Sequence, residues 1–195
     1  GADAACGTLN ITGSTTTNST NAIVDVGAFT LTCSTVNIIG GSGNTRIAKI
    51  TATTGSILNI STSLGFQAST NAGRAVLDLS GGAATVNLEG TLVLNTLGTI
   101  TPGTTSIFNY NGSGAQTVNF SSAIKYAGLK LSNSSGGGAT LGAAVSSTNV
   151  TGNITVVSGI LYNGGFAIAG NSGKTFQVNS GATFIMTGIS AMPST

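Results

Sequence analysis

Short runs in which apolar residues alternate with other residues, each run followed by glycine or another small residue, constrain this chain more than any other feature. Between residues 153 and 188 such runs occur at 154–156, 166–168, 176–178 and 184–186. A period of two predicts β-strands that bury one face. Because these runs and the small residues between them make up most of this segment, their pattern by itself predicts the architecture.

Similar runs recur about every ten residues along the whole chain, with Gly, Asn and Ser between them. The strands expected in the first half are 8–12, 22–26, 29–33, 35–39, 46–50, 57–60, 76–79, 85–88 and 91–94. Those expected in the second half are 107–110, 116–120, 128–131, 150, 154–157, 160–162, 166–169, 175–178 and 183–186. The run nearest to a helical pattern, 121–129, contains Gly128. We therefore predict an all-β chain.

The residues between the strands favour a parallel β-solenoid. Antiparallel hairpins are typically closed by Asn-Gly pairs, and the clear ones are Asn111-Gly112 and Asn163-Gly164. Most strands are instead followed by a single glycine, as at Gly159, where the chain turns a corner. With two or three strands per coil, a repeat of about 20–30 residues fits stacked architectures. We predict one solenoid domain over 1–195, with a β-sandwich as the alternative fold.

The composition suits stacked coils. The chain has 5% charged and 40% hydrophobic residues, which predicts a folded protein whose surface is mainly Thr, Ser, Asn and Gly. In a solenoid like residues stack on like residues, and rows of Asn or Thr pair along the stack where rows of equal charge would repel. The low charge of this chain is therefore consistent with a solenoid.

The two cysteines, Cys6 and Cys33, are not in a CxxC motif, and the chain has no histidine. A zinc site or a cysteine-histidine nucleophile is thus disfavoured. A disulfide or two inert buried thiols remain, and we favour a disulfide that clamps the N-terminal part of the fold by roughly 3 kcal/mol. With the small-residue start of the chain, this predicts a mature secreted protein or a fragment of one, at the cell surface or beyond.

Few other chemistries are indicated. The six cations form no patch interleaved with aromatic residues, so we expect no nucleic-acid partner. We expect no membrane span, no metal and no cofactor. Asp78 and Glu89 are the nearest approach to the carboxylate pair of a glycosidase, but we expect no enzyme and interpret them as surface acids that pair with Arg74 or Lys49. Threonine-rich stretches such as 15–17, 30–32 and 51–54 raise ice binding as a lesser possibility.

The second half resembles a known repeat. The segments "YNGSGAQTVNF", "YAGLKLSNSSGGGATLG" and "VTGNITVVSGILYNGGFAIAG" are similar to a recurrent module of large secreted surface proteins of Bacteroidetes-type bacteria, over residues of about 105–188. The resemblance implies a parallel β-helix with an adhesive or structural role and no catalytic residue to carry over. This chain ends at "AMPST", without the sorting domain that such proteins often carry.

The ends of a solenoid expose strand edges, which native proteins usually blunt with charge, proline or a cap. Here only Asp3, Asp25 and Lys174 lie near the terminal strands. We therefore expect a subunit that assembles head to tail with itself into an extracellular filament. The residues expected at this interface are Leu9, Ile11, Phe176, Val178, Phe184 and Met186. The alternative is a segment of an adhesin or stalk that binds a partner, another cell or a surface glycan.

Overall fold

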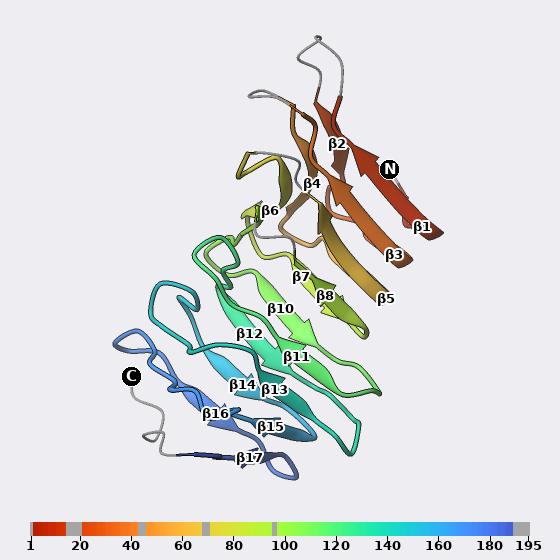
Figure 1. Cartoon of the computed structure of the whole chain (residues 1–195). Coiled ribbons are helices and arrows are strands. Elements are labelled where there is room, and N and C mark those ends of the chain that lie inside the picture. The colour runs from red at the N-terminus through yellow and green to blue at the C-terminus, as the bar shows by residue number, and fades with distance from the viewer. Residues whose placement is uncertain (1, 15–20, 43–45, 68–70, 95–96, 189–195) are drawn as a thin grey trace.

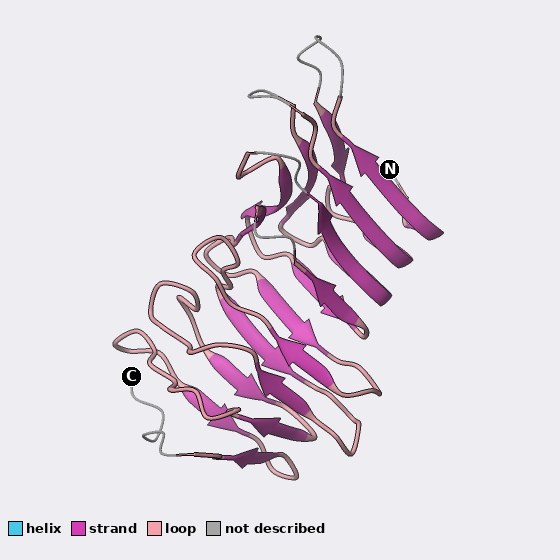
Figure 2. Cartoon of the chain, viewed as in Figure 1, coloured by secondary structure: helices cyan, strands magenta, loops and turns pink. Residues whose placement is uncertain are grey.

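The chain winds into a solenoid whose successive coils stack as parallel sheets (Figure 1). The computed structural model describes residues 2–14, 21–42, 46–67, 71–94 and 97–188. No helix occurs among these residues, as Figure 2 shows. Strands pair in parallel, so the predicted parallel β-solenoid is confirmed and the alternative sandwich is wrong.

Three sheets form the sides of the stack. Sheet A, which runs the length of the rod, stacks in order β1 (Ala4–Thr12), β3 (Thr30–Ile39), β5 (Ile57–Gln67), β7 (Thr85–Leu88), β10 (Ile107–Tyr110), β12 (Gly128–Leu131), β14 (Ile154–Val156) and β16 (Phe176–Val178), and β8 (Thr91–Val93) pairs with β5. Sheet B contains β2 (Ala22–Asp25), β4 (Ala48–Thr53), β6 (Ala75–Gly81) and β9 (Gly98–Thr101). Sheet C contains β11 (Gln116–Val118), β13 (Ala139–Leu141), β15 (Ile160–Tyr162) and β17 (Thr183–Ile185).

The coils are shorter in the C-terminal half of the rod than in the N-terminal half. Register partners lie 27 residues apart between β1 and β3, 28 apart between β5 and β7, and 21 apart between β10 and β12. These values fall within the repeat length expected from the sequence. In the first coils one long strand covers two sides, and its register shifts between Cys33 and Thr35, where the strand bends. In later coils separate strands of sheets A and C take its place.

Several boundaries differ from the predictions. The expected strands 29–33 and 35–39 are one strand, β3, because Ser34 lies at the bend and not at a break. Expected strands at 150 and 166–169 are isolated bridges, Tyr126 with Val150 and Val145 with Ile168. The second half of β5, together with β9 and β13, was not predicted, because glycines interrupt or flank these short runs.

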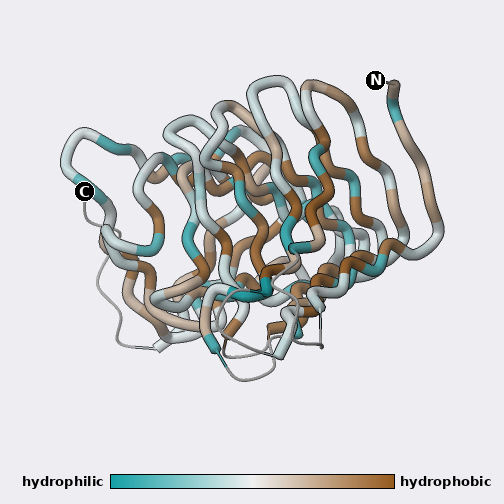
Figure 3. Tube along the Cα trace, turned by 90° about the horizontal axis from the view of Figure 1, so that it is seen from above, coloured by the Kyte–Doolittle hydropathy of each residue, from teal (hydrophilic) through white to brown (hydrophobic). Residues whose placement is uncertain are grey.

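Inward-facing side chains form continuous rows that make the core. One row in sheet A consists of Leu31, Leu58, Val86, Phe108, Leu129, Ile154 and Phe176. Figure 3 shows the coils side by side between the termini, with hydrophobic segments recurring from coil to coil. Full burial of each such side chain stabilises the fold by about 1.5–3 kcal/mol, so the core supplies the main driving force for stacking.

Asparagine side chains form a ladder on the outside of sheet A, as the composition predicts. The Asn87 amide donates to Asn59 Oδ1 at 2.9 Å, and the Asn109 amide donates to Asn87 Oδ1 at 3.1 Å. Nearer the N-terminus, Asn37 donates to Asn10 Oδ1 at 2.8 Å. Each amide both donates and accepts, so a row of identical residues satisfies its own polar groups along the stack.

The buried side-chain amide of Gln116 links sheets A and C in the interior of the rod. Gln116 Nε2 donates to the carbonyls of Leu88 and Gly90, each at 2.8 Å. Its Oε1 accepts from the Gly112 N–H and from the Asn133 amide, each at 2.9 Å. All four hydrogen-bonding positions of Gln116 are used, which is why a polar side chain is stable in this interior position.

Glycine is required at one corner in particular. Gly159, between β14 and β15, adopts φ +73°, and a Cβ atom there would lie 1.7 Å from the Asn133 carbonyl oxygen. Both the left-handed backbone and the contact with the coil below exclude other residues. The predicted role of this glycine as a corner is confirmed.

Candidate assembly interface

The sheets end in edge strands at both ends of the rod. At the N-terminal end β1 pairs with β3 and β2 pairs with β4, and at the C-terminal end β16 pairs with β14 and β17 pairs with β15. Within the described ranges, no further strand pairs with the outer edges of these four strands. Their outward N–H and C=O groups form a template on which a parallel strand can add.

The C-terminal end presents an aromatic pair. The rings of Phe176 and Phe184 pack edge to face with centroids 4.8 Å apart, and both side chains are half-buried. Val178 is 39% exposed, whereas its row neighbour Val156 in the coil before is fully buried. Met186 is half-buried and follows β17. Apolar side chains that a further coil would cover are therefore partly open here.

The N-terminal end presents an apolar hollow of about 370 Å³. Its apolar lining consists of Ala2, Ala4, Val24, Val26, Phe29 and Leu31. Phe29 is 37% exposed. Ala4 occupies the place in the sheet A row where other coils carry Leu, Val, Ile or Phe, so the row begins with a small side chain and leaves space beside it.

The other two residues expected at the interface differ in position. Leu9 is half-buried on the second half of β1. Ile11 is only 4% exposed and belongs to the core, because it packs in the row with Ile38. The Ile11 side chain is thus not a surface contact in this chain, in contrast to the expectation from its position near the N-terminus.

The two halves of the chain differ in charge. Residues 1–89 contain three cations and four acids, a net charge of −1, and residues 90–195 contain three cations and no acid, a net charge of +3. Asp3 and Asp25 are exposed near the N-terminal end, and Lys174 is exposed just before β16. Asp3 Oδ1 also accepts a hydrogen bond from the Thr30 N–H at 2.8 Å, which holds this carboxylate beside the hollow.

Cys6 and Cys33 form a disulfide, as expected, between register partners on β1 and β3. Their Cα atoms are 4.8 Å apart, and Cys33 is buried. The bond closes a loop with a sequence separation of 27 residues. It ties the terminal strand of sheet A to the next one, so β1 is held in place as an edge.

The acidic residues considered for catalysis lie on different sides of the rod. Asp78 is on β6 of sheet B, whereas Glu89 follows β7 of sheet A. Lys49 Nζ lies 3.1 Å from Asp78 Oδ2, so the interpretation of Asp78 as an ion-paired surface acid is confirmed. Partial burial raises the pKa of Asp78, but the hydrogen bonds from Ser80 and the Lys49 ammonium group outweigh burial and hold this pKa below its ordinary value.

Other features give no candidate site. In the described part of the chain, no group of three His, Cys, Asp or Glu residues lies close enough to hold a metal ion. No helix among those residues has the length and apolar character needed to cross a membrane. Of the threonine stretches considered for ice binding, 15–17 lies outside the described residues. The other two lie on different sheets, with Thr30 and Thr32 on β3 and Thr51 and Thr53 on β4.

Comparisons with protein-family models, with curated proteins and with solved structures find no match to this chain. The resemblance of residues 105–188 to a bacterial surface-protein module therefore stays a prediction.

Proposed function

We propose that this chain is a secreted structural subunit that assembles with copies of itself, head to tail, into an extracellular filament. The observation that carries the proposal is that sheet A begins and ends with parallel edge strands, β1 and β16. A second copy translated along the rod places its β1 on β16 in the same parallel sense that every step within sheet A uses. Such a contact is heterologous and does not close, so it propagates into a fibre.

The register of the rows indicates how two copies meet. Continuing the sheet A rows by one step places Phe176 opposite Ala4 and Val178 opposite Cys6 of the next copy. Phe176 then enters the side of the rod where the N-terminal hollow lies, and small Ala4 leaves room for its ring. Phe184 ends the inward row of sheet C, which runs back through Leu161 and Ala139.

The charge distribution supports the same polarity. The basic C-terminal half meets the acidic N-terminal end in a head-to-tail contact, whereas head-to-head or tail-to-tail contacts bring equal charges together. Lys174 on one copy and Asp3 or Asp25 on the next are the charged groups nearest to the contact. We therefore expect assembly to weaken as salt is added, because these groups are exposed and screened.

The secreted location is part of the proposal and rests on the Cys6–Cys33 disulfide, since such bonds persist in oxidising compartments. A stalk or adhesin segment needs the same rod but no end-to-end contact. Self-assembly of the purified chain distinguishes the two roles.

Electron microscopy of the purified chain tests the proposal. The eight stacked strands of sheet A, at about 4.8 Å each, predict an axial repeat of about 38 Å, and fibre diffraction should show the strand spacing along the filament axis. A chain that remains monomeric at high concentration and low salt contradicts the proposal.

A variant blocked at one end tests the polarity. Val178→Lys places a charge on the C-terminal edge and should abolish filaments of the variant alone, while its N-terminal end stays intact. Added in small amounts to the wild-type chain, it should therefore shorten filaments by terminating them. Val93→Lys is the matched control, because Val93 is exposed in the middle of the rod. Equal effects of both substitutions would refute an end-to-end contact through β16.

A further inference from the structure

A groove crosses the outer surface of sheet A in the C-terminal half of the rod. It encloses about 260 Å³ and spans β10, β12 and β14. It exists because Gly128, at the start of β12, takes an outward position beside Ile107, where a larger residue would fill the surface. A Cβ atom at Gly128 would lie 3.3 Å from the Ser106 carbonyl oxygen, within the groove floor.

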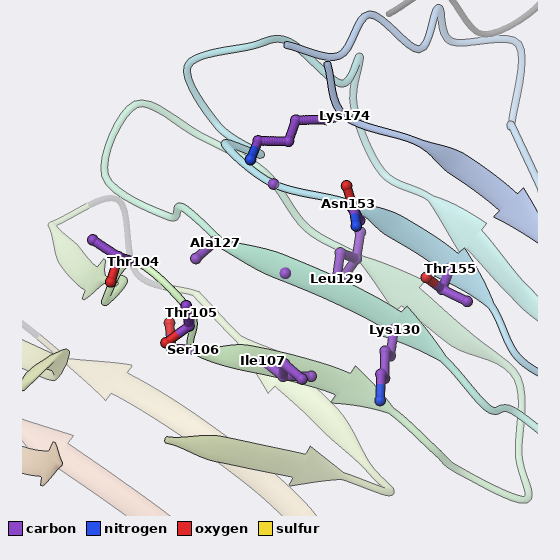
Figure 4. A pocket seen from close by; sticks show the side chains of 12 residues that line it. Thr104, Thr105, Ser106, Ile107, Ala127, Leu129, Lys130, Asn153, Thr155 and Lys174 are labelled. Carbon is purple, nitrogen blue, oxygen red and sulfur yellow. The ribbon is translucent and has the colours of Figure 1, made fainter. Parts of the chain in front are cut away.

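The polar groups around this groove are hydroxyls, an amide and two ammonium groups. Lys130 and Lys174 line it together with Thr104, Thr105, Asn153 and Thr155. In Figure 4 the two lysines lie at opposite margins, with Asn153 and Leu129 between them. Asn153 Oδ1 accepts from the Thr175 N–H at 3.1 Å, which fixes this amide at the rim.

The charge of the two lysines has no internal counterpart in this half of the chain. No Asp or Glu follows Glu89 in the sequence, whereas Lys49 in the other half is paired with Asp78. Both Lys130 and Lys174 are exposed. An anion that enters the groove therefore meets two cations and no carboxylate among the lining residues.

We propose that this groove binds an acidic saccharide, with sugar carboxylates held by the lysines at its two margins and sugar hydroxyls hydrogen-bonded by the threonines and Asn153. The volume is slightly below the usual range of about 300–1,000 Å³ for small-molecule pockets, and suits one sugar unit of a longer chain that lies across the open groove. No aromatic side chain lines the groove, so a sugar ring has no stacking surface there. A neutral sugar also gains nothing from the charges of the two lysines. The groove lies on the side of the rod, and among its lining residues only Lys174 is also near the proposed contact, so Lys130→Gln probes the site without altering that contact.

Equilibrium dialysis with labelled trigalacturonate at low ionic strength tests the site, with the protein kept at a concentration at which it is monomeric. Lys130→Gln and Lys174→Gln should each weaken binding about two- to fivefold, as expected for exposed charge pairs. Gly128→Thr, which fills the groove without changing charge, should weaken it further. Lys125→Gln is the matched control: it removes an equal charge from the same half, next to Ile124 on another side, and should leave binding unchanged.

Neutral galactotriose and inorganic phosphate complete the design. Weak binding of both, relative to trigalacturonate, supports a site for an acidic sugar. Phosphate that competes as well as the uronate shows a simple anion site and overturns the saccharide part of the proposal. Undetectable binding of trigalacturonate, or a loss with Lys125→Gln equal to that with Lys130→Gln, overturns the site itself.

Discussion

Replacing Tyr126 with phenylalanine should cost this protein more stability than its small change in volume implies. Tyr110 and Tyr126 are fully buried, and their hydroxyl oxygens lie 2.9 Å apart. The Tyr126 O–H donates to the Asn119 carbonyl at 2.8 Å. Because Tyr126 has one proton to donate, the Tyr110 O–H must be the donor in the hydrogen bond between the tyrosines, and the three groups form a directed chain.

The direction of this hydrogen-bond chain determines how much stability each substitution should cost. Tyr126→Phe leaves the Tyr110 O–H and the Asn119 carbonyl both unsatisfied, at about 1–3 kcal/mol each, so we expect a loss of about 2–6 kcal/mol. Tyr110→Phe removes one hydrogen bond but leaves Tyr126 bonded to Asn119, at about 1 kcal/mol. In the double variant only the Asn119 carbonyl is left without a hydrogen bond, so the double variant should lose no more stability than Tyr126→Phe.

Urea unfolding followed by circular dichroism measures these free energies and the coupling between the two sites. We expect the double variant to be at least about 1 kcal/mol more stable than the sum of the single losses predicts. The aromatic packing is retained in all variants, because Phe108 and Phe120 still contact the rings. Additive losses, or a larger loss with Tyr110→Phe than with Tyr126→Phe, would refute the directed chain.

The same pair predicts a pH dependence. Burial raises the pKa of Tyr110 to about 12 and raises the pKa of Tyr126 well above its ordinary value of 10.0. In the unfolded chain both groups ionise near pH 10, so above that pH the folded state holds more protons than the unfolded state. Stability from this pair should thus be fully present below about pH 10 and fall as the pH rises toward 12. The fall should be less steep in Tyr110→Phe.

Two further perturbations test the stacking itself. Replacing Cys6 and Cys33 together by alanine should lower the free energy of unfolding by about 3 kcal/mol, because the unfolded chain loses a 27-residue cross-link; equal stability of oxidised wild type and variant in a urea titration would contradict this role. Asn87→Ala should cost about 1–2 kcal/mol, since Asn87 bonds to both Asn59 and Asn109, while Asn10→Ala, which breaks one bond at the start of its row, should cost about half as much in the same titration.

Local patterns were sufficient to predict the strands and the fold class. Alternation in 154–157 and 175–178 reports burial of every second side chain, which depends on neighbours along the chain. Gly159 was recognisable as a corner for the same reason. The pairing of Cys6 with Cys33 also followed, because the chain offers no other cysteine.

Other features that depend on contacts between coils were not predicted. Gln116 and Asn133 have polar neighbours in the sequence, which predicts exposed side chains. Both side chains are buried, because they hydrogen-bond to backbone carbonyls of neighbouring coils. Ile11 was placed at the interface by its position near the N-terminus, but the row it shares with Ile38 places it in the core. The groove at Gly128 likewise has no local signal, since it depends on what lies beside that glycine.

The sequence by itself determined that this chain forms short parallel strands with small corners, because period-two burial and glycine spacing are local properties. Only the tertiary structure decided which residues stack on which, since register between coils 21 to 28 residues long depends on how each corner is built. That register aligns Phe176 with the start of the sheet A row at Ala4, and it gathers Lys130 and Lys174 around one groove. Both proposals therefore depend on the register between coils, which cannot be read from any single stretch of the sequence.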